Sequence, residues 1–224
     1  MTNKLAIIAG AGGALGPALA RTLGQAGYDT VGVARNNPGG AFKDFVQADL
    51  SAPQDVESAF ASILSRHGAP AVLIYNAHKF LIETFEDTSI EQFEAVWRTD
   101  TLGAFAAIKS VLPAMLAGGG TILFSGATAS TRGSAKFSAF ASAKFALRGL
   151  AQSLAREYGP KGIHVAHIII DGLIDGGHAQ QLFSVPAADC IPADALARQY
   201  LDLIRQPSGA WTHEIDIRPS GGKF

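Results

Sequence analysis

The sequence predicts a single α/β domain in which helices cover both faces of a doubly wound parallel sheet, giving three αβα layers. Short apolar runs alternate with helical patterns along almost the whole chain. Near-continuous apolar runs are typical of parallel strands that are buried on both faces. The chain has 224 residues, of which 48% are hydrophobic, and this is enough for one substantial core. We therefore treat residues 1–224 as one domain.

The expected elements follow one another in βα alternation. The apolar runs predict strands at 4–9, 30–34, 44–48, 71–75, 121–125, 164–170 and 214–217. Helical patterns lie at 14–26, 53–66, 89–116, 138–158 and 193–205. Ser51 and Ser89 are each followed by Gln three residues later, which is the spacing of a capping box at a helix start. Residues 176–192 look like a loop, at the place where such folds carry a mobile cap over the ligand.

Composition narrows the classes of partner. Lys plus Arg (18) nearly balances Asp plus Glu (19), without a basic run, so neither nucleic acid nor an anionic membrane surface is an expected partner. The single cysteine, Cys190, excludes an internal disulfide and a Cys-cluster metal site. The first apolar run is too short for a signal peptide or a membrane span. We expect a soluble cytoplasmic protein with a small-molecule substrate and no metal.

The first expected strand leads into the glycine-rich stretch GAGGALG, Gly10 to Gly16, and then into a helix. Small residues let backbone N–H groups approach a pyrophosphate at the positive end of a helix. The stretch departs from G-x-G-x-x-G, because Leu15 stands at the third glycine position, and fits G-x-x-x-[G/A]-x-G with Gly10, Ala14 and Gly16. A tight turn without a ligand is the alternative, and the position after strand one favours a nucleotide.

Taken together, several motifs resemble those of the short-chain dehydrogenase/reductase superfamily over nearly the whole chain. They are the spacing of Gly10 and Gly16, Asp49-Leu50, Asn76-Ala77, Lys144 and Gly172. The resemblance implies a Rossmann-type domain that binds NAD(H) or NADP(H), transfers hydride to or from a carbonyl or alcohol, and assembles into homodimers or homotetramers. The cofactor-binding positions that it implies are Gly10, Gly12, Gly13, Leu15, Gly16, Arg35, Asp49, Leu50, Asn76, Ala77, Lys144, Gly172 and Ile174.

The end of the second strand bears on the choice of cofactor. An acid there binds the ribose hydroxyls of NAD(H), whereas an arginine attracts the 2′-phosphate of NADP(H). The sequence has Ala34-Arg35 and no acid in reach, so NADP(H) is favoured over NAD(H), unless Arg35 is only a solvated charge. Asp49 corresponds to a family residue that hydrogen-bonds near the adenine, and it could instead help to cap the helix near Ser51.

The catalytic positions depart from the family pattern. The family has a tyrosine four residues before the lysine, a serine thirteen residues before the tyrosine, and an asparagine in the preceding long helix. The matching residues are Phe140, Ala127 and Asp100, while Lys144 is unchanged. A positioned general acid contributes roughly 10² to 10⁴ in rate, so its loss would slow carbonyl reduction and leave binding intact.

Three residues are candidates for a substitute proton donor, namely His78, Thr128 and Asp100. His78 can titrate near neutrality, Thr128 could reach the substrate if its loop bulges, and Asp100 could shuttle protons or only pair with Lys144. Three functions remain open: an NADP(H)-dependent oxidoreductase acting on a carbonyl, alcohol or activated alkene, an NADP(H)-binding sensor or partner without catalysis, and a non-redox lyase or epimerase. In the last, the acidic residues Asp100, Asp171 and Asp175 would matter more than the cofactor.

Overall fold

The computed structural model describes residues 4–221, and in that part of the chain seven strands form one sheet. The strands are β1 Lys4–Ala9, β2 Tyr28–Ala34, β3 Asp44–Gln47, β4 Val72–Tyr75, β5 Gly120–Ser125, β6 Ile163–Ile170 and β7 Glu214–Ile217. Each predicted strand is confirmed to within two residues at either end. Continuous burial of the central strands explains why apolar runs, rather than alternation, identified them.

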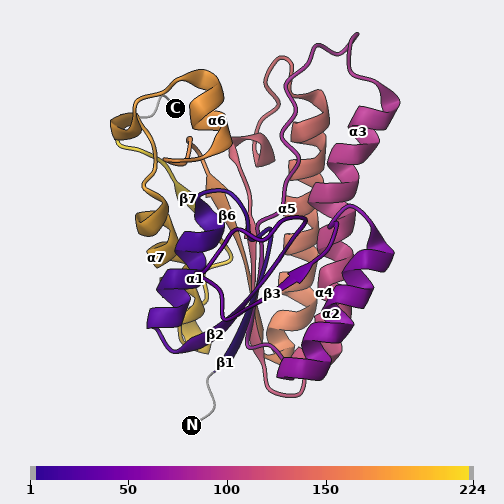
Figure 1. Ribbon diagram of the computed structural model, residues 1–224, viewed down its shortest axis with the longest axis vertical. Helices are drawn as coiled ribbons and strands as arrows, with labels where there is room; N and C mark the ends of the chain where they lie inside the picture. The colour runs from indigo at the N-terminus through magenta and orange to yellow at the C-terminus, as the bar shows by residue number, and fades with distance from the viewer. Residues whose placement is uncertain (1–3, 222–224) are drawn as a thin grey trace.

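All neighbouring strands are parallel, and their order is β3-β2-β1-β4-β5-β6-β7. The order reverses direction between β1 and β4, where the chain starts to build the second half of the sheet (Figure 1). In open α/β sheets such a switch point leaves a crevice at the carboxyl ends of the strands. The predicted doubly wound fold is therefore confirmed.

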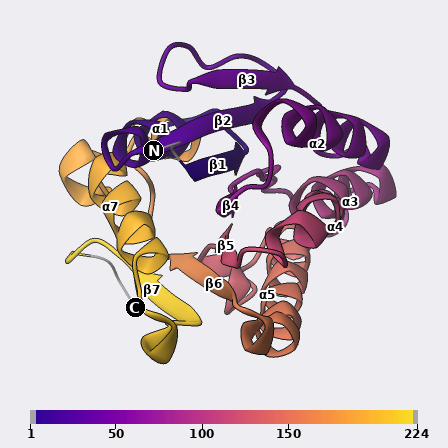
Figure 2. The ribbon, with the colours of Figure 1, turned by 90° about the horizontal axis from the view of Figure 1, so that it is seen from below.

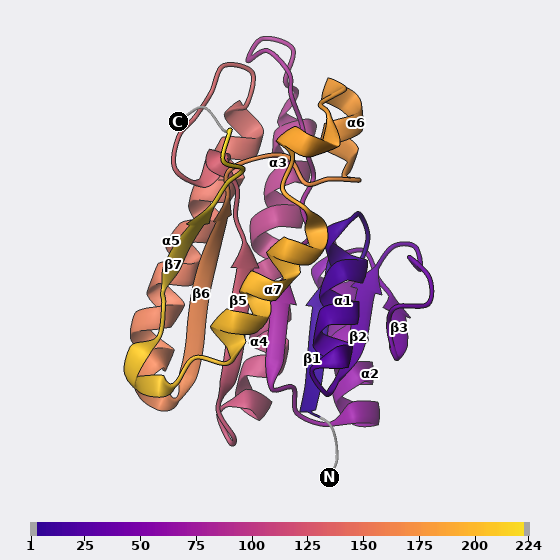
Figure 3. The same cartoon turned by 90° about the vertical axis from the view of Figure 1, so that its left-hand side faces the viewer.

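Helices cover both faces of the sheet. Their bounds are α1 Leu15–Gln25, α2 Pro53–His67, α3 Ile90–Trp97, α4 Gly103–Met115, α5 Ser138–Tyr158, α6 His178–Phe183 and α7 Ala193–Ile204. Helices α1 and α7 lie side by side on one face, and α2, α4 and α5 cover the other (Figures 2 and 3). Alternate residues of β1 serve the two layers, since Ile7 packs with the α2 side and Ile8 with the α1 side.

The helix predicted at 89–116 is not continuous. It consists of α3, a π-helical turn at Arg98–Leu102, and α4. Close packing accompanies the break: the Tyr75 hydroxyl donates to the Thr99 carbonyl at 2.5 Å, and a Cβ on Gly103 would lie 2.0 Å from the Leu50 carbonyl oxygen. Asp100 lies within the π turn, and such turns are frequent at functional sites.

The two predicted capping boxes have different outcomes. At α3, the Ser89 side chain accepts from the Gln92 N–H, and the Gln92 side chain accepts from the Ser89 N–H, as predicted. At α2, the prediction for Ser51 is wrong, because the helix starts at Pro53 with Ala52 as its N-cap and no side-chain cap. The Ser51 hydroxyl donates to the Asp49 carboxylate instead, at 2.8 Å.

The segment 176–192 is more ordered than a loop. It contains α6 and a 3₁₀ turn at Ala187–Asp189, and α6 stands above the carboxyl ends of the strands (Figure 1). No helix within residues 4–221 has both the length and the apolar character that a membrane crossing requires. Among the same residues, no group of three or more His, Cys, Asp or Glu side chains is arranged to hold a metal ion.

The β6 histidines are part of the fold. His164 stacks on Trp211, with 5.0 Å between ring centroids, and His167 contacts the Glu214 carboxylate through Nδ1 at 3.0 Å. The Nε2 atom of His167 is buried without a hydrogen-bond partner. Burial therefore lowers the pKa of His167 from 6.5 to about 4.

This buried imidazole predicts a loss of stability in acid. Because the folded-state pKa of His167 lies below its unfolded value, the unfolded chain takes up the proton first as the pH falls from 6.5 towards 4. The contribution of neutral His167 to the free energy of unfolding is complete above pH 6.5. It decreases by up to about 3 kcal/mol as the pH falls from 6.5 to about 4. Urea unfolding at several pH values should show a shallower dependence for His167→Gln than for wild type. An unchanged dependence would assign the acid sensitivity to other groups.

Candidate functional site

A cavity of about 1070 Å³ lies at the carboxyl ends of β1, β4 and β5, beneath α6. Its walls contain nearly all the residues predicted for the site. The predicted residues that line it are Gly10, Gly12, Gly13, Leu15, Arg35, Asp49, Leu50, Asn76, Ala77, His78, Thr128, Lys144, Gly172 and Ile174. Gly16 and Asp100 do not line it, because both are buried behind the wall.

The glycine-rich turn forms an open cradle on one side of the cavity. A Cβ at Gly12 or Gly13 would meet no atom within 4 Å, so this side of the turn is free for a ligand. The other side is tightly packed: a Cβ on Gly10, whose φ is +91°, would lie 2.3 Å from the Ala77 nitrogen. At Gly16 it would lie 2.0 Å from the Ala11 carbonyl oxygen. Backbone N–H groups beside the start of α1 thus fit the pyrophosphate of a dinucleotide.

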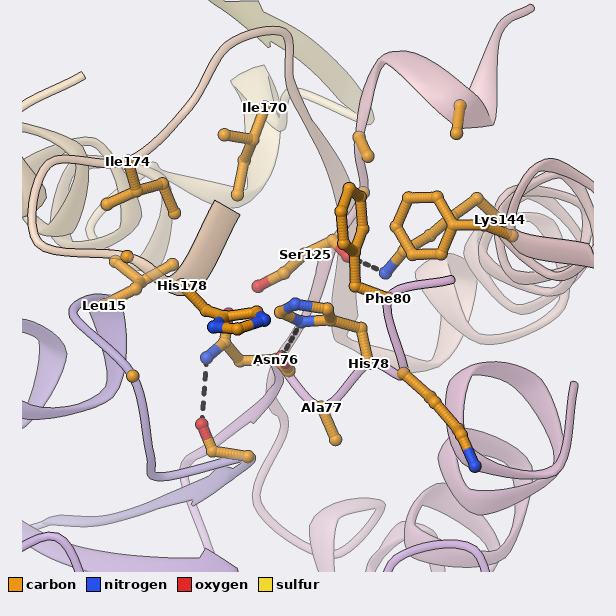
Figure 4. A pocket seen from close by; sticks show the side chains of 18 of the residues that line it. Leu15, Asn76, Ala77, His78, Phe80, Ser125, Lys144, Ile170, Ile174 and His178 are labelled. Atoms are coloured by element: carbon orange, nitrogen blue, oxygen red, sulfur yellow. Dashed lines mark hydrogen bonds between the residues drawn. The ribbon is translucent and has the colours of Figure 1, made fainter. Parts of the chain in front are cut away.

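Asn76 joins the cradle to the end of β4. Its Nδ2 donates to the Gly10 carbonyl oxygen at 2.9 Å (Figure 4). Its backbone N–H donates to the Ala9 carbonyl oxygen at 2.7 Å. These bonds hold the two strands of the switch point together at the place where β1 turns away. Asn76 and Ala77 therefore position the cradle and also line the cavity.

Arg35 and Asp49 line the end of the cavity at β2 and β3, away from Lys144. Arg35 follows β2 and is exposed at the cavity wall. Asp49 accepts from the Ser51 N–H at 2.9 Å and from the Ser51 hydroxyl, and these hydrogen bonds, with the nearby Arg35 charge, lower the pKa of Asp49. Asp49 thus stays ionised and shapes the turn that precedes α2.

Lys144 and Asp100 form an ion pair below the cavity. The Lys144 Nζ lies 3.2 Å from Asp100 Oδ2 and donates to the Ser125 carbonyl at 3.1 Å (Figure 4). Asp100 is fully buried, and its Oδ1 accepts from the Lys79 N–H at 2.7 Å. Phe140 covers the ammonium, since Nζ is 5.5 Å from the centroid of its ring. Ala127, at the position where the family has a serine, lines the cavity with a methyl group.

The other two candidate donors have defined surroundings. Desolvation, followed by the nearby Lys144 charge, lowers the pKa of His78, which favours the neutral imidazole. The rings of His78 and His178 point toward one another in the cavity (Figure 4). The Thr128 hydroxyl donates to the Asp171 carboxylate, which is also ion-paired with Arg218 at 3.2 Å.

Some residues of the cavity wall were not predicted from the sequence. Aromatic residues contributed by separate segments line it, together with a second histidine: Phe80, Phe137 and His178. Phe183, on α6 within the 176–192 segment, also lines the cavity. In the sequence, only the position of Phe80 pointed to this part of the wall, because Phe80 lies two residues after the candidate residue His78.

The strand order, the glycine cradle before α1 and the cavity across the carboxyl edge define a dinucleotide-binding protein of the Rossmann class. The family model described as short chain dehydrogenase matches residues 4–184. The chain therefore belongs to the short-chain dehydrogenase family, whose members bind a nicotinamide cofactor.

Known relatives agree with this membership. The 3-oxoacyl-[acyl-carrier-protein] reductase FabG of Escherichia coli is 28% identical over 240 residues, covering 99% of this chain and 98% of the relative. The crystal structure of a short-chain dehydrogenase from Rhodopseudomonas palustris is 32% identical, with a TM-score of 0.80, and covers 97% of this chain and 99% of that one. A metagenomic short-chain oxidoreductase in complex with NADP shares the fold at 23% identity, with a TM-score of 0.82 and 97% of each chain covered.

The buried ion pair should be strongly coupled. Removing either partner leaves a buried charge uncompensated, so Asp100→Asn and Lys144→Met should each lower the free energy of unfolding by about 3–5 kcal/mol. The double variant should lose clearly less than the sum, because it removes both charges. Denaturant unfolding of the four proteins measures this coupling.

The exposed pair Arg98 and Glu94, at the end of α3 and the start of the π turn, supplies the control. Glu94→Gln should change the free energy of unfolding by no more than about 0.5 kcal/mol. Additive losses at Lys144 and Asp100 would show that the two charges do not depend on each other.

Proposed function

We propose that the protein is an NADP(H)-dependent oxidoreductase of short-chain type, which transfers hydride to or from a carbonyl, an alcohol or an activated alkene. The observation that carries this proposal is Arg35, which stands after β2 on the wall of the cavity that the glycine cradle opens. A guanidinium there attracts a 2′-phosphate by charge and by bidentate hydrogen bonding. The NADP complex of the metagenomic relative gives further support.

Different residues of the cavity bind different parts of the cofactor. When bound, a nicotinamide cofactor supplies or accepts the hydride. The N–H groups around Gly12 and Gly13 hold its pyrophosphate, and Arg35 binds the phosphorylated ribose at the far end. Lys144, held by Asp100 and the Ser125 carbonyl, presents its ammonium to the nicotinamide ribose.

Phe140 favours a second candidate, an NADP(H)-binding sensor or partner without turnover. Its ring stands against Lys144 where a hydroxyl would serve as the proton donor. A lyase or epimerase has less support, because two of the three acidic groups that it would use are already engaged and the third, Asp175, does not line the cavity. Asp100 is paired with Lys144, and Asp171 is bound by Thr128 and Arg218.

We also propose that the chain forms a homo-oligomer through the layer of α3, α4 and α5. Large apolar side chains remain exposed on these helices: Phe93, Trp97, Phe105 and Phe145. Exposed apolar groups gathered on one layer are a common feature of subunit contacts.

Replacing Arg35 should change the preference between the two cofactors. A charge-assisted hydrogen bond is worth about 1.5–3 kcal/mol, so Arg35→Ala should weaken NADPH binding roughly 10- to 100-fold and leave NADH binding nearly unchanged. Calorimetric titration with both nucleotides measures this. Arg205→Ala, which removes an exposed cation that does not line the cavity, is the control. Equal weakening of both nucleotides would contradict the assigned role.

Restoring a hydroxyl should raise the rate of ketone reduction. Phe140→Tyr places a phenol beside the Lys144 ammonium, which lowers the pKa of the phenol and supplies a general acid. We expect NADPH-dependent reduction of simple ketones to rise by about 10²-fold or more. Steady-state assays of wild type and variant test this, with Phe140→Leu as the control that adds no donor. No gain in the tyrosine variant would mean that a ketone does not reach this position.

A further inference from the structure

A wall of phenyl rings surrounds the end of the cavity next to Lys144. The ring of Phe80 is the hub: its centroid lies 5.2 Å from Phe140, 6.0 Å from Phe137 and 6.4 Å from Phe183, each in an edge-to-face arrangement. Phe137 and Phe140 are 6.5 Å apart. Four rings from three separate parts of the chain therefore meet in one place, which we call the phenyl wall.

The phenyl wall reaches the expected reaction centre. Phe140 belongs to it and also covers the Lys144 ammonium, at 5.5 Å. The His78 ring lies 6.4 Å from Phe140 at the same place. Phe183 comes from α6 and is 47% exposed, so the wall is not simply the interior of the fold. A substrate that lies next to Lys144 thus lies against aromatic carbon, which favours a flat apolar molecule.

Hydroxyl groups in the cavity are mostly committed elsewhere. The Ser125 hydroxyl shares a hydrogen bond with the Tyr200 hydroxyl at 2.7 Å. Thr128 donates to Asp171, and Thr99 donates to the Ala95 carbonyl at 3.0 Å. Ser51 donates to Asp49, far from the wall. The remaining lining hydroxyl within residues 4–221 belongs to Ser134, on an exposed loop at the rim.

A simple ketone would meet no free hydroxyl donor beside Lys144 in this site. Hydride addition to a ketone makes an alkoxide, which is about as basic as hydroxide. A phenol has a pKa of about 10, so a phenolate is roughly six pKa units less basic. A substrate whose reduction product is a phenolate needs no proton from the enzyme during the hydride step. The missing hydroxyl at Phe140 is then no obstacle.

We infer that the substrate is a planar aromatic quinone, bound between the phenyl wall and the nicotinamide position. This inference rests on the proposed oxidoreductase function. In the reaction, the C4–H bond of the reduced nicotinamide would break as its hydride forms an O–H bond at one quinone oxygen. NADPH would be oxidised to NADP⁺, and the quinone would be reduced to the hydroquinone monoanion, whose charge lies on the other oxygen. The anion then takes a proton from water, and the sum is quinone plus NADPH plus H⁺ giving hydroquinone plus NADP⁺.

The test compares two probes of similar shape, 1,4-naphthoquinone and 1-tetralone, under anaerobic conditions with NADPH and with an enzyme-free blank. We expect kcat/KM for the quinone to exceed that for the ketone by about 10²-fold or more, the size of the contribution of a missing general acid. We also expect equal quinone rates in H₂O and D₂O, because no proton moves in the hydride step.

Substitutions in the phenyl wall test the binding mode. Phe80→Ala removes the hub ring and should raise KM for naphthoquinone roughly tenfold, with a smaller effect on kcat, because it removes aromatic contact rather than a reacting group. Phe85→Ala, which removes an 80% exposed ring outside the cavity, is the matched control and should leave both constants unchanged.

The outcomes separate this inference from the proposed function. NADPH binding is measured first by calorimetry, and its absence would overturn both. Binding followed by faster turnover of tetralone than of naphthoquinone would overturn the quinone inference alone. So would a clear solvent isotope effect on the quinone reaction, or binding without turnover of either probe. Fast quinone turnover that depends on Phe80 would support it.

Discussion

The ion pair between Lys144 and Asp100 determines what the floor of the cavity can do. Both groups are almost completely buried, and a single charge in that place would be costly without its partner. The pair depends on the π turn at Arg98–Leu102, which contains Asp100, and on the Lys79 N–H, which donates to its second oxygen. The orientation of Lys144 toward the cavity therefore depends on the α3 to α4 junction and on the strand that ends before Lys79.

The sheet and the glycine cradle could be predicted, because the physical constraints that produce them are visible in the sequence. Apolar runs mark each strand because both faces are covered, and Gly10 and Gly16 stand where any Cβ would meet backbone. The π turn was not predictable in the same way, because residues 98–102 contain neither Gly nor Pro and fit a continuous helical pattern. The start of α2 was predicted wrongly for a related reason. Ser51 has the spacing of a capping box, but its hydroxyl donates to the Asp49 carboxylate and its side chain does not cap the helix.

The cavity wall shows a different limit of sequence reasoning. Motif positions such as Asn76 and Lys144 lie at fixed places along strands and helices, so their meeting at the carboxyl edge could be predicted. Phe80, Phe137 and Phe183 lie after β4, before α5 and on α6. Nothing in their spacing brings them together, because loop paths and the position of α6 decide which of them meet. The chemical character of the substrate end is therefore a property of the tertiary structure.

Asp100 and Phe140 are best understood as two parts of one change. A tyrosine at residue 140 would place a polar hydroxyl, and on ionisation a negative charge, near the Lys144 ammonium. A phenyl ring offers only the weaker attraction of its π face. The buried ammonium then needs another counter-charge, and a carboxylate at residue 100 supplies a full one where an amide would supply a dipole. Such a site gives its lysine a carboxylate partner without any hydroxyl, which suits a reaction whose product carries its own negative charge.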